Sequence, residues 1–146
     1  MIYTALTKKA LQIMFDAHKD QLDRAGAPYV FHPFHLAEQM PDEVSVAAAL
    51  LHDVVEDTAI TFDALAAQGI PEEVIGILRL LTHDPAVHYM EYVQKIKLSG
   101  NLRAIQIKLA DLNHNADPTR LDAVTQADVE RFKKYRTAFQ LLEDNS

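Results

Sequence analysis

Apolar residues recur along most of the chain at the three- to four-residue spacing of amphipathic helices. Within residues 4–21 this spacing produces one apolar face, made up of Ala5, Leu6, Ala10, Ile13, Met14 and Ala17. No segment shows the convincing alternation of apolar and polar residues that is typical of a strand. The pattern therefore predicts an all-α fold.

Prolines, glycines and capping residues divide this pattern into seven or eight helices. Ala25-Gly26-Ala27-Pro28 ends the first helix, and an extended segment then leads to Pro33, a residue suited to the first turn of a helix. Thr61 is placed to cap another helix, because its hydroxyl can accept a hydrogen bond from a backbone N–H of the first turn. The predicted helices cover residues 4–21, 33–40, 41–51, 62–67, 71–81, 89–98, 102–115 and 127–142.

The helix over residues 41–51 stands apart, because residues 44–51 are almost continuously apolar. A helix that is apolar on nearly every side belongs in the centre of a fold. We expect it to be the core of one domain spanning residues 1–146, a length that suits a single domain.

The composition excludes several classes of function and location for this chain. The chain has 14 basic and 21 acidic residues, a net charge of −7 that argues against broad binding to DNA or anionic membranes. It has no cysteine, which excludes disulfides, thiolate catalysis and iron–sulfur clusters. No apolar run approaches the roughly 20 residues of a membrane span, and the N-terminus lacks a signal-peptide layout. We therefore expect a cytoplasmic protein.

The first candidate site is the pair His52-Asp53, which follows the most apolar helix. Burying such a pair is unfavourable unless something balances its charge, and a metal ion would do so. The alternative is a histidine that caps its own helix beside an exposed aspartate. Glu56 and Asp57 favour the site, because on a continuing helix they would share faces with the first pair. Packed carboxylates also shift one another's pKa, as general acid–base catalysis requires.

Two further candidates interrupt apolar surroundings. Asp111 lies among the core positions of the helix over residues 102–115, with Asn115 one turn later. The alternative for this segment is the polar end of a helix, which we prefer for Asn113 and His114. His32 stands between Phe31 and Pro33, where it could also be a hydrogen-bonded core residue. No spacing demands a role for His18, His35, His83 or His88.

Taken together, His32, His52, Asp53 and Asp111 offer two imidazoles and two carboxylates. Four such ligands leave coordination positions for water and a substrate oxygen. Nitrogen and oxygen ligation without sulfur suits manganese, iron, magnesium or zinc.

This order of residues resembles the HD superfamily of metal-dependent phosphohydrolases, and within it the hydrolase domain of the RelA/SpoT type. The resemblance covers about residues 10–140. It rests on three segments, Pro28-Tyr29-Val30-Phe31-His32-Pro33, Leu50-Leu51-His52-Asp53-Val54-Val55-Glu56-Asp57-Thr58 and Ile107-Lys108-Leu109-Ala110-Asp111 with Asn115. It implies an HD-domain helical bundle that removes pyrophosphate from guanosine tetra- and pentaphosphate.

Carried over by position, the resemblance makes His32, His52, Asp53 and Asp111 the metal ligands, with manganese as the expected ion. Glu56 and Asp57 match the acidic pair that handles the attacking water and its proton. Substrate contacts are implied for Asn115, Arg24 and Tyr135, and Lys108 could offset phosphate charge.

The sequence departs from the family in places. The basic run before the glycine is reduced to Asp23-Arg24-Ala25-Gly26, and the segment after Leu81-Thr82 is short. We expect no synthetase activity from these 146 residues, because they cannot accommodate the synthetase domain of the long enzymes of the family.

Two other function classes stay open from the sequence. One is an HD phosphohydrolase that acts on a nucleoside monophosphate or on the 2′-phosphate of NADPH. The other is a non-catalytic module that binds a nucleotide. A homo-oligomer is also open, since Phe132, Tyr135 and Phe139 could line the core or a dimer surface, and we assign them to the core.

Overall fold

The computed structural model describes residues 1–144 and confirms the all-α prediction. Within this range the only β-type pairing is an isolated antiparallel bridge between Leu22 and Pro28. The helices are α1 (Ala5–His18), α2 (Phe31–Glu38), α3 (Glu43–Leu51), α4 (Val54–Asp57), α5 (Phe62–Ala67), α6 (Glu72–Leu81), α7 (Tyr89–Leu98), α8 (Leu102–Asn115), the 3-10 helix η1 (Pro118–Arg120) and α9 (Gln126–Glu143).

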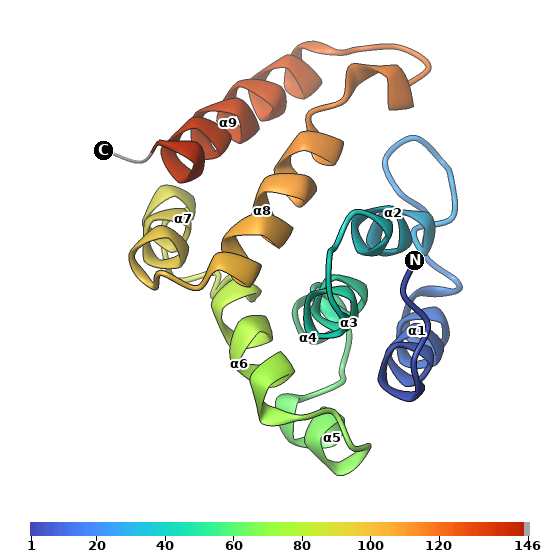
Figure 1. Ribbon diagram of the computed structural model, residues 1–146. Coiled ribbons are helices and arrows are strands. Elements are labelled where there is room, and N and C mark those ends of the chain that lie inside the picture. The colour runs from blue at the N-terminus through green and yellow to red at the C-terminus, as the bar shows by residue number, and fades with distance from the viewer. Residues whose placement is uncertain (145–146) are drawn as a thin grey trace.

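Helix α3 occupies the centre of the fold, as its composition predicts. Every residue from 45 to 51 is buried, and the helix packs against α1, α2, α6 and α8 (Figure 1). Small alanines at positions 47, 48 and 49 allow neighbouring helices to approach from several sides. The apolar run thus forms the core around which the other helices assemble.

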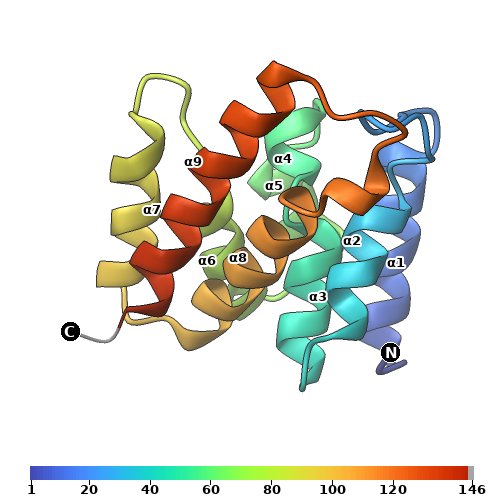
Figure 2. The ribbon, with the colours of Figure 1, turned by 90° about the horizontal axis from the view of Figure 1, so that it is seen from above.

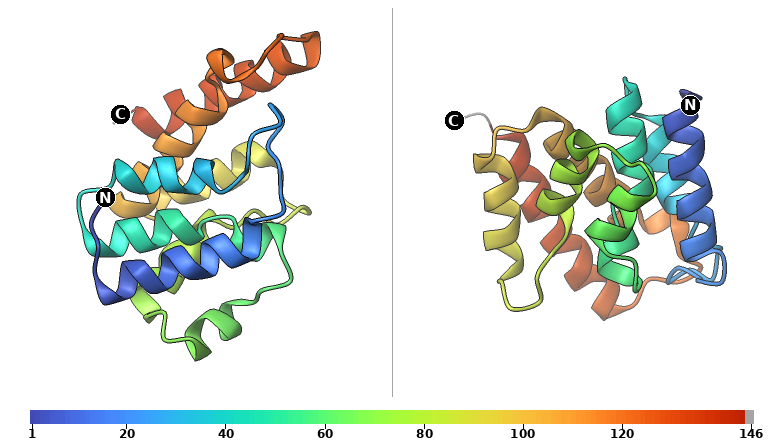
Figure 3. Two further views of the ribbon diagram at one scale, coloured as in Figure 1. Left: turned by 90° about the vertical axis from the view of Figure 1, so that its right-hand side faces the viewer. Right: turned by 90° about the horizontal axis from the view of Figure 1, so that it is seen from below.

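The remaining helices flank α3 on two sides. Helices α1 and α2 lie on one side, and α6 and α8 lie on the other, as Figures 1 and 2 show. Helices α7 and α9 pack against each other, and α9 also covers α8 (Figure 3). Helix α8 connects the two sides, because it contacts both α2 and α3.

No helix within residues 1–144 combines the length and the apolar character needed to cross a bilayer.

Capping side chains fix where several helices begin. The Thr61 hydroxyl accepts a hydrogen bond from the Ala64 N–H at 3.1 Å, which confirms the predicted cap of α5. Asp42 caps α3 in the same way, through the Ser45 N–H at 2.9 Å. Such caps satisfy backbone donors that the first turn of a helix leaves without partners.

Two local differences from the predicted boundaries bear on the site. Helix α2 begins at Phe31, so His32 lies inside the helix and Pro33 is still in its first turn. The central helix does not continue through His52 and Asp53, because Asp53 adopts φ −108° and ψ 1° and the short helix α4 begins after it. The break lies at the pair of residues predicted to bind a metal ion.

The loop after α1 is built around Asp23. Its carboxylate oxygen Oδ1 accepts hydrogen bonds from the N–H groups of Ala25 and Ala27, both at 2.9 Å. Gly26 closes the turn with φ +84°, a conformation that favours glycine. This loop holds Arg24 and the segment that leads into α2.

We predict that Leu50→Ala destabilises the protein by about 2–5 kcal/mol, because it leaves a cavity in the buried centre of α3. Leu98→Ala is the matched control, since Leu98 is 74% exposed at the end of α7. Urea denaturation followed by circular dichroism measures both. Equal unfolding free energies in the two variants would contradict the central role of α3.

Candidate metal centre and adjoining cleft

The four predicted ligands come together from three parts of the chain. His32 lies on α2, His52 and Asp53 lie between α3 and α4, and Asp111 lies on α8. His32 Nε2 is 2.9 Å from Asp111 Oδ1, and His52 Nε2 is 3.0 Å from Asp53 Oδ2. Ligand atoms of His32, His52 and Asp53 all lie within 4.8 Å of one another, an arrangement that could hold a metal ion.

The surroundings of His52 fit a metal ligand. Its Nδ1 lies 2.7 Å from the Ala49 carbonyl oxygen and so donates its hydrogen there, which in the neutral ring leaves a lone pair on Nε2. The buried Nε2 makes no hydrogen bond within the described residues, although Asp53 Oδ2 lies 3.0 Å away. A backbone carbonyl that holds one ring nitrogen while the other is free is the usual arrangement for a metal-binding histidine.

Asp111 is the most heavily contacted carboxylate of the cluster. Lys108 Nζ donates to its Oδ2 at 2.9 Å, and the Asn115 amide donates to its Oδ1 at 3.0 Å. Burial would raise the pKa of Asp111, but the Lys108 ammonium and the His32 hydrogen bond outweigh it and hold the pKa well below its ordinary value. Asp111 therefore stays ionised, as a metal ligand must.

Asp53 has a partner of its own. The Tyr29 hydroxyl donates a hydrogen bond to Asp53 Oδ2. Burial would raise the pKa of Asp53, yet the neighbouring His52 lowers it to about 2. Sequence reasoning gave Tyr29 no individual role, although it belongs to the Pro28-Tyr29 segment on which the family resemblance rests.

The cluster attracts positive charge. Burial alone would lower the pKa of His52, but the carboxylates of Asp53 and Asp111 raise it well above its ordinary value. A proton and a divalent cation would compete for this position, since imidazole binds metals in its neutral form. The donor set thus fits an oxygen- and nitrogen-liganded divalent ion.

Glu56 and Asp57 lie on α4, directly after the ligand pair. The Glu56 Oε1 accepts a hydrogen bond from the His83 backbone N–H at 2.6 Å, which connects α4 to the loop after α6. Removal from water raises the pKa of Asp57 to about 6, helped by the negative charges of Asp53 and Glu56. Removal from water also raises the pKa of Glu56. Asp57 can therefore accept a proton near neutral pH.

A cleft of about 490 Å³ adjoins this cluster, and we call it the main cleft. The cluster and its acidic neighbours contribute His32, Asp53, Glu56 and Asp57 to the wall. The other lining residues are Leu22, Asp23, Arg24, Ala25, Tyr29, Asn115, Asp117, Arg120, Leu121, Arg131, Phe132 and Tyr135. Acidic groups and arginines thus line one cavity, as a metal-bound anionic substrate would require.

The three arginines of the main cleft differ in their partners. Arg120 pairs with Asp23 at 3.1 Å, and Arg131 pairs with Asp128. Arg24 is exposed and forms no ion pair with the described residues. Arg24 is therefore the cleft cation most available to an anion. Sequence reasoning missed Arg120 and Arg131, which come from the segment around η1 and from α9.

The other predicted substrate contacts are divided between two cavities. Asn115 and Tyr135 line the main cleft. Lys108 lines a smaller cavity of about 60 Å³, where its ammonium lies over the rings of Tyr89 and Tyr92. The candidate ligands His52, Asp53 and Asp111 also line this cavity. Phe132 is buried, whereas Tyr135 and Phe139 are partly buried against the core.

Three of the histidines to which the sequence gave no role lie near the cluster. His18 packs against the Tyr29 ring, and the His83 backbone holds Glu56. His114 lies parallel to His32, with ring centroids 5.0 Å apart. Burial and the nearby Arg120 lower the pKa of His114 to about 4. Its position beside a ligand results from the packing of α8 on α2, which the sequence does not reveal.

Known proteins resemble this chain over most of its length. No family model matches the chain. It is 35% identical over 120 residues to the bifunctional (p)ppGpp synthase/hydrolase SpoT of Escherichia coli K12, which covers 74% of this chain and 17% of that protein. It is also 35% identical over 114 residues to the guanosine-3′,5′-bis(diphosphate) 3′-pyrophosphohydrolase of Haemophilus influenzae, covering 68% of this chain and 16% of that protein.

A solved structure of similar fold extends the likeness to the whole chain. It belongs to a metazoan ortholog of SpoT described as hydrolysing ppGpp, and it is 27% identical with a TM-score of 0.78. The match covers 100% of this chain and 90% of the other. The helical fold and the His/Asp cluster therefore define an HD domain. Within that class, the chain belongs to the RelA/SpoT-type hydrolase domains, although it spans only 17% of the length of the E. coli relative.

The raised pKa of Asp57 gives a testable pH dependence for the metal-free protein. The pKa of Asp57 is about 6 in the folded chain, compared with the ordinary value of 3.8. Between these two pH values, Asp57 therefore keeps its proton in the folded chain but loses it in the unfolded chain. The contribution of Asp57 to stability is therefore largest below this window and is lost as the pH rises through it. We expect Asp57→Asn to weaken this loss when unfolding free energies are measured with EDTA from about pH 4 to about pH 7. An unchanged pH dependence in the variant would contradict the assigned pKa.

Proposed function

We propose that this chain is a metal-dependent phosphohydrolase that removes pyrophosphate from the 3′ position of guanosine tetra- or pentaphosphate. The observation that carries the proposal is the convergence of His32, His52, Asp53 and Asp111 beside the cleft that holds Glu56 and Asp57. Relatives named for this hydrolysis and the similar metazoan structure support the choice of substrate.

The four ligand residues would hold a divalent ion, for which we propose Mn²⁺ ahead of iron, magnesium or zinc. Bound there, such an ion supplies an activated water near neutral pH and polarises the phosphoryl oxygen under attack. The chain's own groups prepare this position. Ala49 fixes the tautomer of His52, Lys108 keeps Asp111 ionised, and Tyr29 holds Asp53 in place.

Asp57 is the group best suited to take the proton of the attacking water. Its pKa of about 6 allows the carboxylate to be present near neutral pH while remaining basic enough to accept a proton. Glu56 is less free to move, because it is held by the His83 N–H. We therefore assign proton acceptance to Asp57 and orientation of the water to Glu56.

The arginines of the main cleft would bind the negatively charged nucleotide. Arg24 has no ion pair among the described residues, so its guanidinium can engage a phosphate without first breaking one. Tyr135 and Asn115 line the same cavity and offer a ring face and an amide to the nucleoside. These contacts make an anionic nucleotide the substrate class that the cleft suits best.

The first test is incubation of the purified protein with guanosine tetraphosphate and Mn²⁺, followed by measurement of released pyrophosphate. We expect release by the unaltered chain and none by Asp53→Ala, which removes a ligand carboxylate. Asp63→Ala is the matched control, because it removes an exposed carboxylate on α5.

The same incubation with nucleoside monophosphates or NADPH, followed by measurement of released phosphate, separates this proposal from other phosphohydrolases. Release of phosphate from those compounds alone would replace the proposed substrate. Metal-loaded, folded protein that cleaves none of these compounds would favour a nucleotide-binding module.

A second test addresses the acidic pair. We expect Asp57→Asn to lower kcat by roughly 10²–10⁴-fold with metal binding retained, since a general base contributes that much. Glu56→Gln should lower turnover as well. Unchanged turnover in metal-loaded Asp57→Asn would show that the proton goes elsewhere.

A further inference from the structure

His114 lies against the metal-ligand candidate His32, although the two residues are 82 positions apart in the sequence. Their rings are nearly parallel, with 5° between the planes, and their Nδ1 atoms are 2.7 Å apart. His114 occupies the last turn of α8, one turn after Asp111, and His32 occupies the first turn of α2. Two imidazoles at this separation form a hydrogen bond rather than a simple packing contact.

The Nδ1···Nδ1 contact has a chemical consequence. Two ring nitrogens at 2.7 Å need one hydrogen between them, so one ring donates and the other accepts. In the metal-free chain, His32 Nε2 lies 2.9 Å from the ionised Asp111 Oδ1 and donates to it, so its Nδ1 accepts from His114. To bind a cation through Nε2, the neutral His32 ring must instead carry its hydrogen on Nδ1 and donate it to His114, which leaves a lone pair on Nε2. A neutral histidine must present such a lone pair to bind a metal ion. An acceptor at His114 therefore stabilises the metal-binding tautomer of His32 once Nε2 no longer donates to Asp111.

For the neighbouring candidate ligand His52, a backbone carbonyl group is the acceptor that holds the ring. Its Nδ1 donates to the Ala49 carbonyl oxygen at 2.7 Å. His32 has no backbone acceptor for its Nδ1 among the described contacts, so a side chain from another helix provides one. The backbone of His114 is itself held by Arg120, whose guanidinium donates a hydrogen bond to the His114 carbonyl oxygen at 2.9 Å.

We propose that His114 is a positioning residue that sets the tautomer and ring orientation of His32 for binding a divalent cation. It touches neither the metal nor the substrate and acts only through His32. The inference rests on the metal centre of the proposed function. It makes no use of the identity of the substrate.

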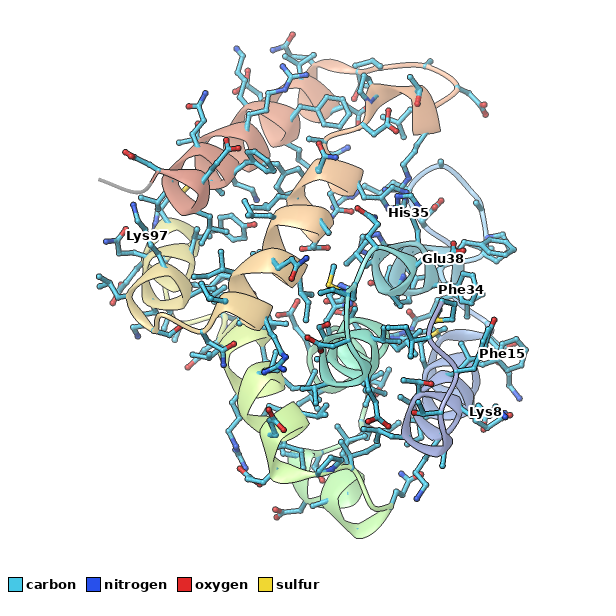
Figure 4. The ribbon with its side chains drawn as sticks, viewed as in Figure 1. Lys8, Phe15, Phe34, His35, Glu38 and Lys97 are labelled. Atoms are coloured by element: carbon cyan, nitrogen blue, oxygen red, sulfur yellow. The ribbon has the colours of Figure 1, made fainter. Side chains whose placement is uncertain are left out.

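Two substitutions separate the hydrogen bond from the packing. His114→Phe keeps an aromatic ring beside His32 and removes the acceptor nitrogen. His114→Asn removes the ring, but its Oδ1 stands close to the place of the histidine Nδ1 and can accept from His32. His35→Phe is the matched control, because the His35 ring also packs against His114, with its centroid 4.3 Å away, and projects from α2 (Figure 4).

The measurement is the dissociation constant for Mn²⁺, obtained by titration calorimetry on the full chain after treatment with EDTA. We expect roughly 10–100-fold weaker binding in His114→Phe, the usual effect of losing a residue that orients a ligand. His114→Asn and His35→Phe should stay close to the unaltered chain. Thermal unfolding of each metal-free variant checks that the fold is retained.

Three results would overturn the inference. Unchanged Mn²⁺ affinity in His114→Phe would show that no acceptor is needed. Loss of affinity in His114→Asn but not in His114→Phe would show that ring packing matters instead. An unaltered chain that binds no Mn²⁺ would remove both this inference and the metal centre. By contrast, the expected binding without pyrophosphate release would reject the proposed reaction and leave the role of His114 intact.

Discussion

The buried carboxylate of Asp111 is the constraint on which the arrangement of the candidate site depends. An ionised carboxylate away from water is strongly unfavourable unless charges and donors surround it. Lys108, His32 and Asn115 contact its two oxygens, and these three residues come from α8 and α2. Lys108 in turn lies over the rings of Tyr89 and Tyr92 on α7. Satisfying one carboxylate thus fixes where α2 and α7 lie relative to α8.

The break between α3 and α4 is the second feature that positions the residues of the site. Helix α3 is buried from 45 to 51, and its apolar packing leaves little freedom in where the helix ends. His52 follows directly and donates to the Ala49 carbonyl oxygen, so the end of the core helix itself orients a ligand. The short helix α4 then presents Glu56 and Asp57 to the same cleft. A rigid core and the main cleft therefore meet within six residues of chain, 52–57.

Local charge, rather than net charge, decides what the cleft can accept. The chain is acidic, with a net charge of −7, yet Arg24, Arg120 and Arg131 line the main cleft together with its acidic residues. A divalent cation at the cluster would add further positive charge there.

The likeness to the metazoan ortholog covers the whole chain, whereas the bacterial relatives are several times longer. The chain therefore matches only a part of each bacterial relative but nearly the whole of the metazoan structure.

The sequence by itself determined the all-α class, the central helix, the Thr61 cap and the identity of the four candidate ligands. These features depend on the spacing of residues near one another in the chain, and the family resemblance rests on such local strings as well. Only the tertiary structure decided how Tyr29 reaches Asp53, how His114 reaches His32, and how Arg120 and Arg131 enter the cleft. It also decided that Lys108 faces Asp111 and a separate small cavity. Each of these depends on how helices distant in sequence pack together, which local spacing does not specify.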